Sequence, residues 1–223
     1  MTAFETDIAR LTVPEDPPPL LAEDCPTCGA GLPEGSRFCN QCGRALGTTL
    51  AGAPGDVVTI LFADLEGWTS FASGVGHEEV REVILGFHAL VREQVGRHGG
   101  FEVKQMGDGF MIAFANPTRA VACAADIQRS MSAQYVPPGT RLVRVCVGIN
   151  SGDAIREGDD FFGHTVNVAS RIAGRADGGQ VLVSEVTRVL AGHVEGARFV
   201  DIGRRRLRGL SGRIRLFEVV WED

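Results

Sequence analysis

The sequence predicts an α+β fold in which helices pack on a largely antiparallel sheet. Val57–Ala63 is a short apolar run rich in β-branched residues, which is typical of a buried strand. Glu78–His98 carries apolar residues at helical spacing and ends at a glycine pair. Phe101–Met106 and Phe110–Ala115 flank Gly107-Asp108-Gly109, a pattern that favours a hairpin. Mixed strands and helices of this kind indicate a layered domain.

The second half of the domain continues the alternation of helices and strands. Pro117 is expected to open a helix that runs to about residue 134, since proline fits the first helical position. Further elements are predicted by apolar pattern: a strand at Leu142–Asn150, a helix at Thr165–Arg175, a strand at Val181–Ser184 and a last strand at Arg215–Val220. No internal repeat is evident.

Changes in composition divide the 223 residues into four segments. We expect a proline-rich tail at 1–21, a compact cysteine unit at 22–46, a linker at 47–55 and the main domain at 56–223. The net charge of −6 disfavours nucleic-acid binding through bulk charge, and the absence of an 18-residue apolar run disfavours a membrane span. The N-terminus lacks the apolar stretch of a secretory signal, so a cytoplasmic location is expected.

Four of the six cysteines form two Cys-x-x-Cys pairs, Cys25 with Cys28 and Cys39 with Cys42. Four thiolates can complete the tetrahedral shell of one structural Zn²⁺, and a segment this small needs such a metal to fold. Two redox pairs or unliganded thiols are the alternative. The pairing suggests thiols that are kept reduced and used for metal binding.

Two aspartates follow predicted strands at positions suited to metal binding. Asp64 ends the first strand, and Asp108 lies at the tip of the hairpin. If these strands are neighbours, the carboxylates meet, and they repel each other unless a divalent ion lies between them. Two Mg²⁺ ions held in this way are typical of phosphoryl transfer. Taken singly, each aspartate could equally be a helix cap or a turn residue.

An amide and a guanidinium share one face of a later helix. Asn167 and Arg171 are four residues apart, a spacing that suits contacts to a sugar and a phosphate. By itself the pair is equally compatible with a solvated helix face.

Three motifs in this order resemble the class III nucleotide cyclases. They are Phe-x-Asp-x-x-Gly-x-Thr around Asp64, Lys-x-x-Gly-Asp ending at Asp108, and Asp-x-x-Gly-x-x-Val-Asn-x-Ala-x-Arg from Asp160 to Arg171. The resemblance covers about residues 56–223 and implies the ferredoxin-like α/β sandwich of that family. Residues 22–46 resemble the short zinc ribbons of many bacterial proteins, which implies a structural or interaction role.

The resemblance also implies a role for each matching residue. Asp64 and Asp108, with the backbone carbonyl of Leu65, would hold two Mg²⁺ or Mn²⁺ ions per active site. Lys104 and Asp160 match the pair that reads the purine, and this combination points to ATP and hence to an adenylate cyclase. Asn167 would orient the ribose, and Arg171 would stabilise charge on the α-phosphate. Arg208 stands where many relatives carry a lysine for the terminal phosphates.

In the family, one protomer supplies the metal aspartates and the other supplies the remaining residues, so the resemblance implies a homodimer with two shared sites. A catalytically silent binding or dimerisation module and a guanylate cyclase are the alternatives. A diguanylate cyclase is disfavoured because its signature is missing and Asn167 and Arg171 would be unexplained. The ribbon has few basic residues, which favours a protein partner, or the chain's own catalytic domain, over nucleic acid.

Overall fold

A computed structural model describes residues 31, 57–133 and 143–222. The predicted tail, cysteine unit and linker lie outside the described residues, apart from position 31. The described chain contains these elements in order: β1 (Val57–Leu65), α1 (Trp68–Ala72), α2 (His77–Arg97), β2 (Phe101–Met106), β3 (Gly109–Phe114), α3 (Pro117–Ser132), β4 (Val145–Asp153), β5 (Ile155–Glu157), β6 (Asp160–Phe162), α4 (His164–Ala173), β7 (Val181–Ser184), α5 (Glu185–Ala191), β8 (Arg198–Arg205) and β9 (Ile214–Val220).

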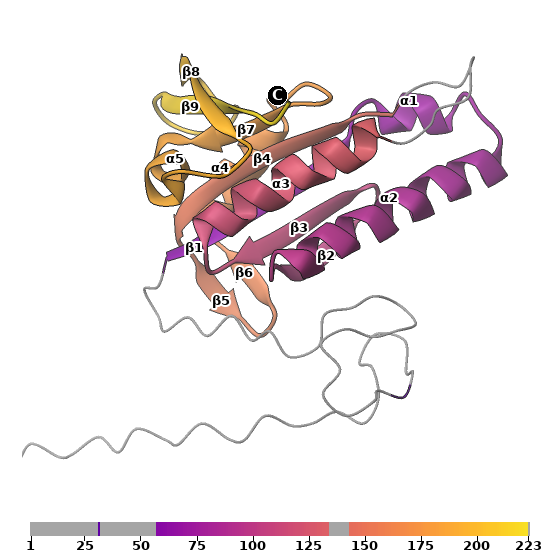
Figure 1. The fold of residues 1–223 in the computed structure, drawn as a ribbon, viewed down its shortest axis with the longest axis horizontal. Helices are drawn as coiled ribbons and strands as arrows, with labels where there is room; N and C mark the ends of the chain where they lie inside the picture. The colour runs from indigo at the N-terminus through magenta and orange to yellow at the C-terminus, as the bar shows by residue number, and fades with distance from the viewer. Residues whose placement is uncertain (1–30, 32–56, 134–142, 223) are drawn as a thin grey trace, which may run out of the picture.

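The main sheet has seven strands in the order β2-β3-β1-β4-β7-β9-β8 (Figure 1). Only β4 and β7 pair in parallel, so the sheet is largely antiparallel, as the sequence predicts. β1 lies at the centre, between β3 and β4, and pairs along its whole length with β4. Strands β5 and β6 form a separate small hairpin.

Helices α2 and α3 cover one face of the sheet (Figure 1). Their apolar faces pack on alternate residues of the central strands, including Leu61 and Ala63 of β1 and Ile112 of β3. α3 begins as expected, with Pro117 in the first turn and the side chain of Asn116 accepting a hydrogen bond from a backbone N–H. This face holds the larger core and fixes the central strands.

Helix α4 lies on the opposite face of the sheet, where it packs on β1 and β4. Gly148 allows this close approach, because an added Cβ there would lie 2.0 Å from the backbone nitrogen of Ala173. The other alternate residues of β1, among them Val58 and Ile60, contact α4 and the β5–β6 hairpin. Asp64 is in phase with Val58 and Ile60, so its side chain belongs to this second face.

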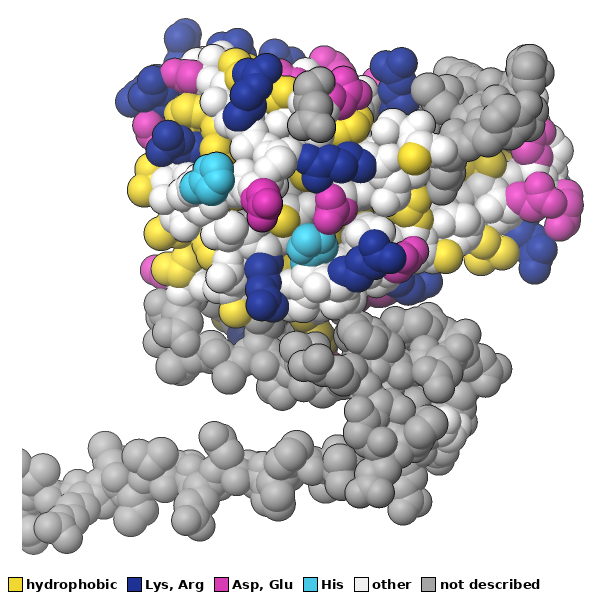
Figure 2. All heavy atoms as spheres, in the orientation of Figure 1, with side chains coloured by type: hydrophobic (Ala, Val, Ile, Leu, Met, Phe, Trp, Pro, Cys, Tyr) yellow, Lys and Arg dark blue, Asp and Glu magenta, His cyan; other side chains and the backbone are white. Residues whose placement is uncertain are grey.

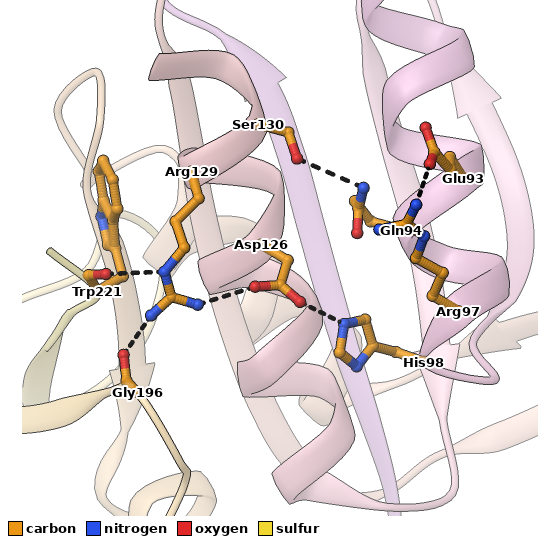
Figure 3. A network of polar contacts seen from close by, with 9 residues as sticks. All are labelled: Glu93, Gln94, Arg97, His98, Asp126, Arg129, Ser130, Gly196 and Trp221. Atoms are coloured by element: carbon orange, nitrogen blue, oxygen red, sulfur yellow. Dashed lines mark hydrogen bonds and ion pairs between the residues drawn. The ribbon is translucent and has the colours of Figure 1, made fainter. Parts of the chain in front are cut away.

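A polar network joins the two helices of the first face to the C-terminal end of the chain (Figure 3). His98 Nε2 lies 2.8 Å from Asp126 Oδ2, and the other oxygen of Asp126 pairs with Arg129 at 2.8 Å. Arg129 also donates to the carbonyl of Trp221 at 3.0 Å and to the carbonyl of Gly196. The network therefore joins the end of α2 to α3, and α3 to the residues just before β8 and just after β9.

The structure differs from the predicted elements in a few places. The strand expected at Leu142–Asn150 begins at Val145 and runs to Asp153. The elements α5, β5, β6 and β8 were not predicted, because each has at most eight residues, too few for a decisive periodicity. In the described ranges, no helix is long and apolar enough to cross a membrane.

Candidate active site

The carboxylates of Asp64 and Asp108 meet at one end of the central strands. β1 pairs with β3 so that Asp64 follows Ala63, whose partner is Phe110, and the β2–β3 turn at Gly107 and Asp108 closes over it. An added Cβ on Gly109 would lie 3.1 Å from Asp64 Oδ1, so a glycine here lets the hairpin approach without displacing that carboxylate.

The surroundings of Asp64 favour its protonated form. Burial, together with the hydrogen bond and negative charge of Asp108, raises the pKa of Asp64 from its ordinary 3.8 to about 7. The backbone N–H of Leu65 donates to Asp64 Oδ1 at 3.1 Å and acts in the opposite direction. Two converging acids of this kind suit a divalent cation, and Mg²⁺ is usually held by one or two carboxylates plus substrate phosphates.

The turn after Asp64 is fixed from both sides. The backbone N–H of Glu66 donates to the carbonyl of Arg144 at 2.8 Å, and its carboxylate accepts from the N–H of Gly178 at 3.0 Å. Gly67 then takes a left-handed conformation, with φ of 63°, and α1 begins directly after it. The sequence therefore places a rigid turn beside the carboxylates.

Lys104 and Asp160 are in contact although 56 residues separate them. Lys104 Nζ lies 2.8 Å from Oδ1 and 2.6 Å from Oδ2 of Asp160. The pairing lowers the pKa of the Asp160 carboxyl, because the lysine hydrogen bond stabilises its charged form. The backbone N–H of Phe161 also donates to Asp160, at 2.8 Å, and the ring of Phe162 lies 5.4 Å from the ammonium.

Asn167 and Arg171 are exposed on the outer side of α4. Their neighbours Val168 and Ile172 are buried against the sheet, which turns the amide and the guanidinium outward. Neither side chain has a hydrogen-bond or ion-pair partner within the described part of the chain. Arg208 is exposed in the connection between β8 and β9, directly after the buried Leu207.

One group of residues around the site was not predicted from the sequence. Arg92 of α2 pairs with both carboxylate oxygens of Glu102 at 2.9 Å and donates to Gln105 Oε1 at 2.9 Å. Gln105 in turn donates to the carbonyl of Gly107 at 3.3 Å, next to Asp108. The chain of contacts steadies the hairpin tip from α2, and no spacing in the sequence reveals it because it crosses between two elements.

The structure describes the residues of the predicted cyclase site but not those of the predicted zinc site. Cys25, Cys28, Cys39 and Cys42 lie outside the described residues. Within the described ranges, no three His, Cys, Asp or Glu side chains form a group that could hold a metal ion. The two other cysteines, Cys123 and Cys146, are buried and free.

Comparisons with known proteins agree with this arrangement. A family model described as the adenylate and guanylate cyclase catalytic domain matches residues 51–220, and a zinc-ribbon domain model matches residues 25–46. A pH-sensitive adenylate cyclase of Mycobacterium tuberculosis is 34% identical over 79% of this chain. The chain spans 43% of that relative's length.

Solved structures give the same family. A structure of adenylate cyclases from Trypanosoma brucei in their monomeric state aligns with a TM-score of 0.68 and 26% identity, covering 76% of this chain and 90% of that one. The guanylyl cyclase Cya2 aligns with a TM-score of 0.62 and 29% identity, covering 75% of this chain and 94% of that one. The chain therefore belongs to the class III adenylate and guanylate cyclase family, as a nucleotide cyclase catalytic domain with an N-terminal zinc-ribbon domain.

Proposed function

We propose that the chain is an adenylate cyclase that converts ATP to 3′,5′-cyclic AMP and pyrophosphate. The observation that carries this proposal is the contact between Lys104 and Asp160, at 2.6 and 2.8 Å. This contact brings one hydrogen-bond donor and one acceptor together at the surface, on the side of the sheet where α4 packs. The similarity to the mycobacterial adenylate cyclase supports the same reaction.

The Lys104–Asp160 pair would read adenine by hydrogen bonding. Adenine offers an acceptor at N1 and a donor at its exocyclic amine, which match a lysine and an aspartate. Guanine offers the reverse at these positions, so the ammonium and the carboxylate would be left without partners on the base. A guanylate cyclase is the second candidate, because the solved guanylyl cyclase Cya2 shares the fold at 29% identity.

Asp64 and Asp108, with the carbonyl of Leu65, would hold two Mg²⁺ or Mn²⁺ ions. The raised pKa of Asp64 fits this assignment, because a partly buried carboxylate beside a second carboxylate is stabilised by a cation. When bound, the ions would stabilise charge on the triphosphate and favour ionisation of the ribose 3′-hydroxyl. The fixed turn at Glu66 would keep Asp64 in place during the reaction.

The remaining residues would orient the nucleotide. Asn167 would hold the ribose, and the Arg171 guanidinium would stabilise the negative charge that develops on the α-phosphate. The 3′-oxygen then forms a bond to the α-phosphorus while the bond to the β-phosphate oxygen breaks, and pyrophosphate leaves. Arg208 would bind the terminal phosphates through its planar fork.

We infer that two copies of the chain share each site. Asp64 and Asp108 of one protomer would face Lys104, Asp160, Asn167 and Arg171 of the other. The outward position of Asn167 and Arg171, with no partner in the described part of the chain, supports this arrangement. A closed two-fold dimer would then contain two equal sites.

The N-terminal segment would bind one structural Zn²⁺ through its four cysteines, Cys25, Cys28, Cys39 and Cys42. Elemental analysis of the purified chain should give one zinc per chain, and Cys39→Ser should lower that ratio. An unchanged ratio would contradict the assignment. We propose a protein partner, or the catalytic domain itself, for this ribbon, and a cytoplasmic location for the chain.

The metal assignment is tested by Asp64→Asn and Asp108→Asn. Either change should lower kcat by about a thousandfold or more, since the ions contribute several kcal/mol to the transition state. Each variant should remain dimeric by light scattering. Glu93→Gln is the matched control, since Glu93 is an exposed residue of α2 that pairs with Arg97. Wild-type activity in either aspartate variant would contradict the assignment.

A further inference from the structure

A cavity of about 580 Å³ lies between the first turn of α4, the end of β4 and the β8–β9 hairpin. Its volume falls in the range of small-molecule sites in proteins. None of the residues assigned above to metal, base, ribose or phosphate binding lines it. Three arginines do, Arg204, Arg213 and Arg215, and basic side chains gather at the β8–β9 end of the molecule in Figure 2. The cavity is therefore basic on the hairpin side.

Two of these arginines face each other across the β8–β9 hairpin. Arg204 lies directly opposite Arg215 in the β8–β9 pairing, and like charges in that position repel. Arg215 is balanced by Asp201 at 2.6 Å and by Glu185 at 3.3 Å. The guanidinium groups of Arg204 and Arg213 have no ion-pair partner among the described residues. Two cations thus remain available to an anion in the cavity.

The opposite wall is the beginning of α4. His164 and Thr165 of its first turn line the cavity, and no side chain caps the helix, because the cap position is Gly163. The first N–H groups of a helix have no partner within it and favour negative charge. The Thr165 hydroxyl is already used, since it donates to the carbonyl of Asp153 at 2.6 Å. This wall adds backbone donors to the arginines.

Neutral groups form the floor of the cavity, and acids are few. Ser151 and Ser184 line it, and both hydroxyls lie 3.0 Å from the buried hydroxyl of Thr187, which makes the floor rigid. Two carboxylates also line the cavity, those of Asp153 and Glu185. Glu185 is paired with Arg215, so among the described lining residues only Asp153 opposes the two uncompensated arginines.

We propose that this cavity is a binding site for a small phosphorylated anion, separate from the proposed ATP site. Arginine forks match phosphate oxygens in pairs, and helix N–H groups bind the same atoms. The bound anion would connect the β8–β9 hairpin to the first turn of α4, one turn before Asn167. The site is independent of the reaction proposed above, because it uses none of the same side chains.

The test is calorimetric titration of the full chain with pyrophosphate, without added Mg²⁺ or Mn²⁺. The protein used in this titration is the double variant Arg171→Ala and Arg208→Ala, so that no arginine of the proposed ATP site contributes to pyrophosphate binding. Binding with a Kd near or below about 1 mM is expected. Adding Arg204→Gln and Arg213→Gln should weaken it by about tenfold or more, because two charge-assisted contacts are lost.

The matched control adds Arg205→Gln and Arg206→Gln instead, which removes the same charge from the same hairpin but not from the cavity lining. This control should change the Kd by less than about twofold. Thermal unfolding with pyrophosphate provides a second readout, since a ligand of the folded state raises Tm. Equal weakening in both quadruple variants, or no binding up to about 5 mM, would overturn the proposal. Cyclic AMP formation by the wild-type chain is measured separately, so the two proposals can fail independently.

Discussion

The ammonium of Lys104 lies within 2.8 Å of both carboxylate oxygens of Asp160, which joins β2 to the start of β6. This pair is already assembled in a single chain, on the same side of the sheet as Asp64. An arrangement with one donor and one acceptor at fixed positions is suited to reading one purine and excluding the other.

Exchanging the pair should change the preference for the base. Lys104→Glu combined with Asp160→Cys should lower kcat/KM for ATP relative to GTP by about a hundredfold, because the hydrogen-bonding pattern then no longer matches adenine. Steady-state assays with both nucleotides measure the ratio. Glu157→Gln on the same hairpin is the control and should leave it unchanged. An unaltered ratio in the double variant would show that other residues select the base.

Metal-free protein should lose stability as the pH rises. The folded pKa of Asp64 is raised to about 7, so the folded state holds a proton that the unfolded state releases above its ordinary value of 3.8. Between about pH 4 and 7 the Tm of the wild type should therefore fall relative to the Tm of Asp64→Asn. The difference between the two Tm values should stay constant above pH 7. Adding Mg²⁺ should reduce this difference in Tm. Thermal unfolding across this range measures the effect.

Asp201→Asn is a control for which the change of stability with pH should have the opposite sign. Arg215 lowers the pKa of the Asp201 carboxyl, so its contribution to stability is present above the ordinary pKa and disappears as the pH falls through the folded value. This variant should thus be less stable than wild type at neutral pH and equal to it in strong acid. The same pH trend in both variants would contradict the account of Asp64.

Mixing two inactive variants should restore activity. Asp64→Ala and Arg171→Ala chains, unfolded together and refolded as an equal mixture, should give about one quarter of wild-type activity, since half of the dimers contain one intact site. Each variant refolded alone should stay inactive. Activity no higher in the mixture than in the separate variants would contradict shared sites.

The contact between α4 and β4 should tolerate no added carbon at Gly148. An alanine there would place Cβ 2.0 Å from the backbone nitrogen of Ala173, so Gly148→Ala should cost about 3 kcal/mol of unfolding free energy. Gly86→Ala is the control, because Gly86 is exposed within α2 with nothing within 4 Å of the new carbon. It should stabilise the protein by up to about 1 kcal/mol. Urea denaturation measures both, and equal effects would contradict the packing described.

The sequence predicted the fold class and the proximity of Asp64 to Asp108 for clear reasons. Strand and hairpin patterns bring Asp64 and Asp108 to neighbouring strands, and the structure brings them together. The contact of Lys104 with Asp160 followed only from family resemblance, because it depends on a hairpin of two three-residue strands that no periodicity can reveal.

Other features depended on tertiary contacts. Helix α5 was missed because it has only seven residues, too few for the spacing of Val186, Val189 and Leu190 to distinguish a helix, and the structure leaves these three exposed. The contacts from Arg92 through Gln105 to Gly107 combine two elements, so neither segment alone indicates them. The basic cavity likewise forms only when the β8–β9 hairpin meets the start of α4.

The most direct test of the central claim is product formation by the purified chain. ATP or GTP is supplied with Mg²⁺ or Mn²⁺ at several protein concentrations, and the nucleotides are separated by chromatography. We predict cyclic AMP from ATP, with specific activity that rises with protein concentration because the site needs two chains. Cyclic GMP as the main product would contradict the assignment of Lys104 and Asp160, and no cyclic nucleotide under any of these conditions would contradict the proposed activity itself.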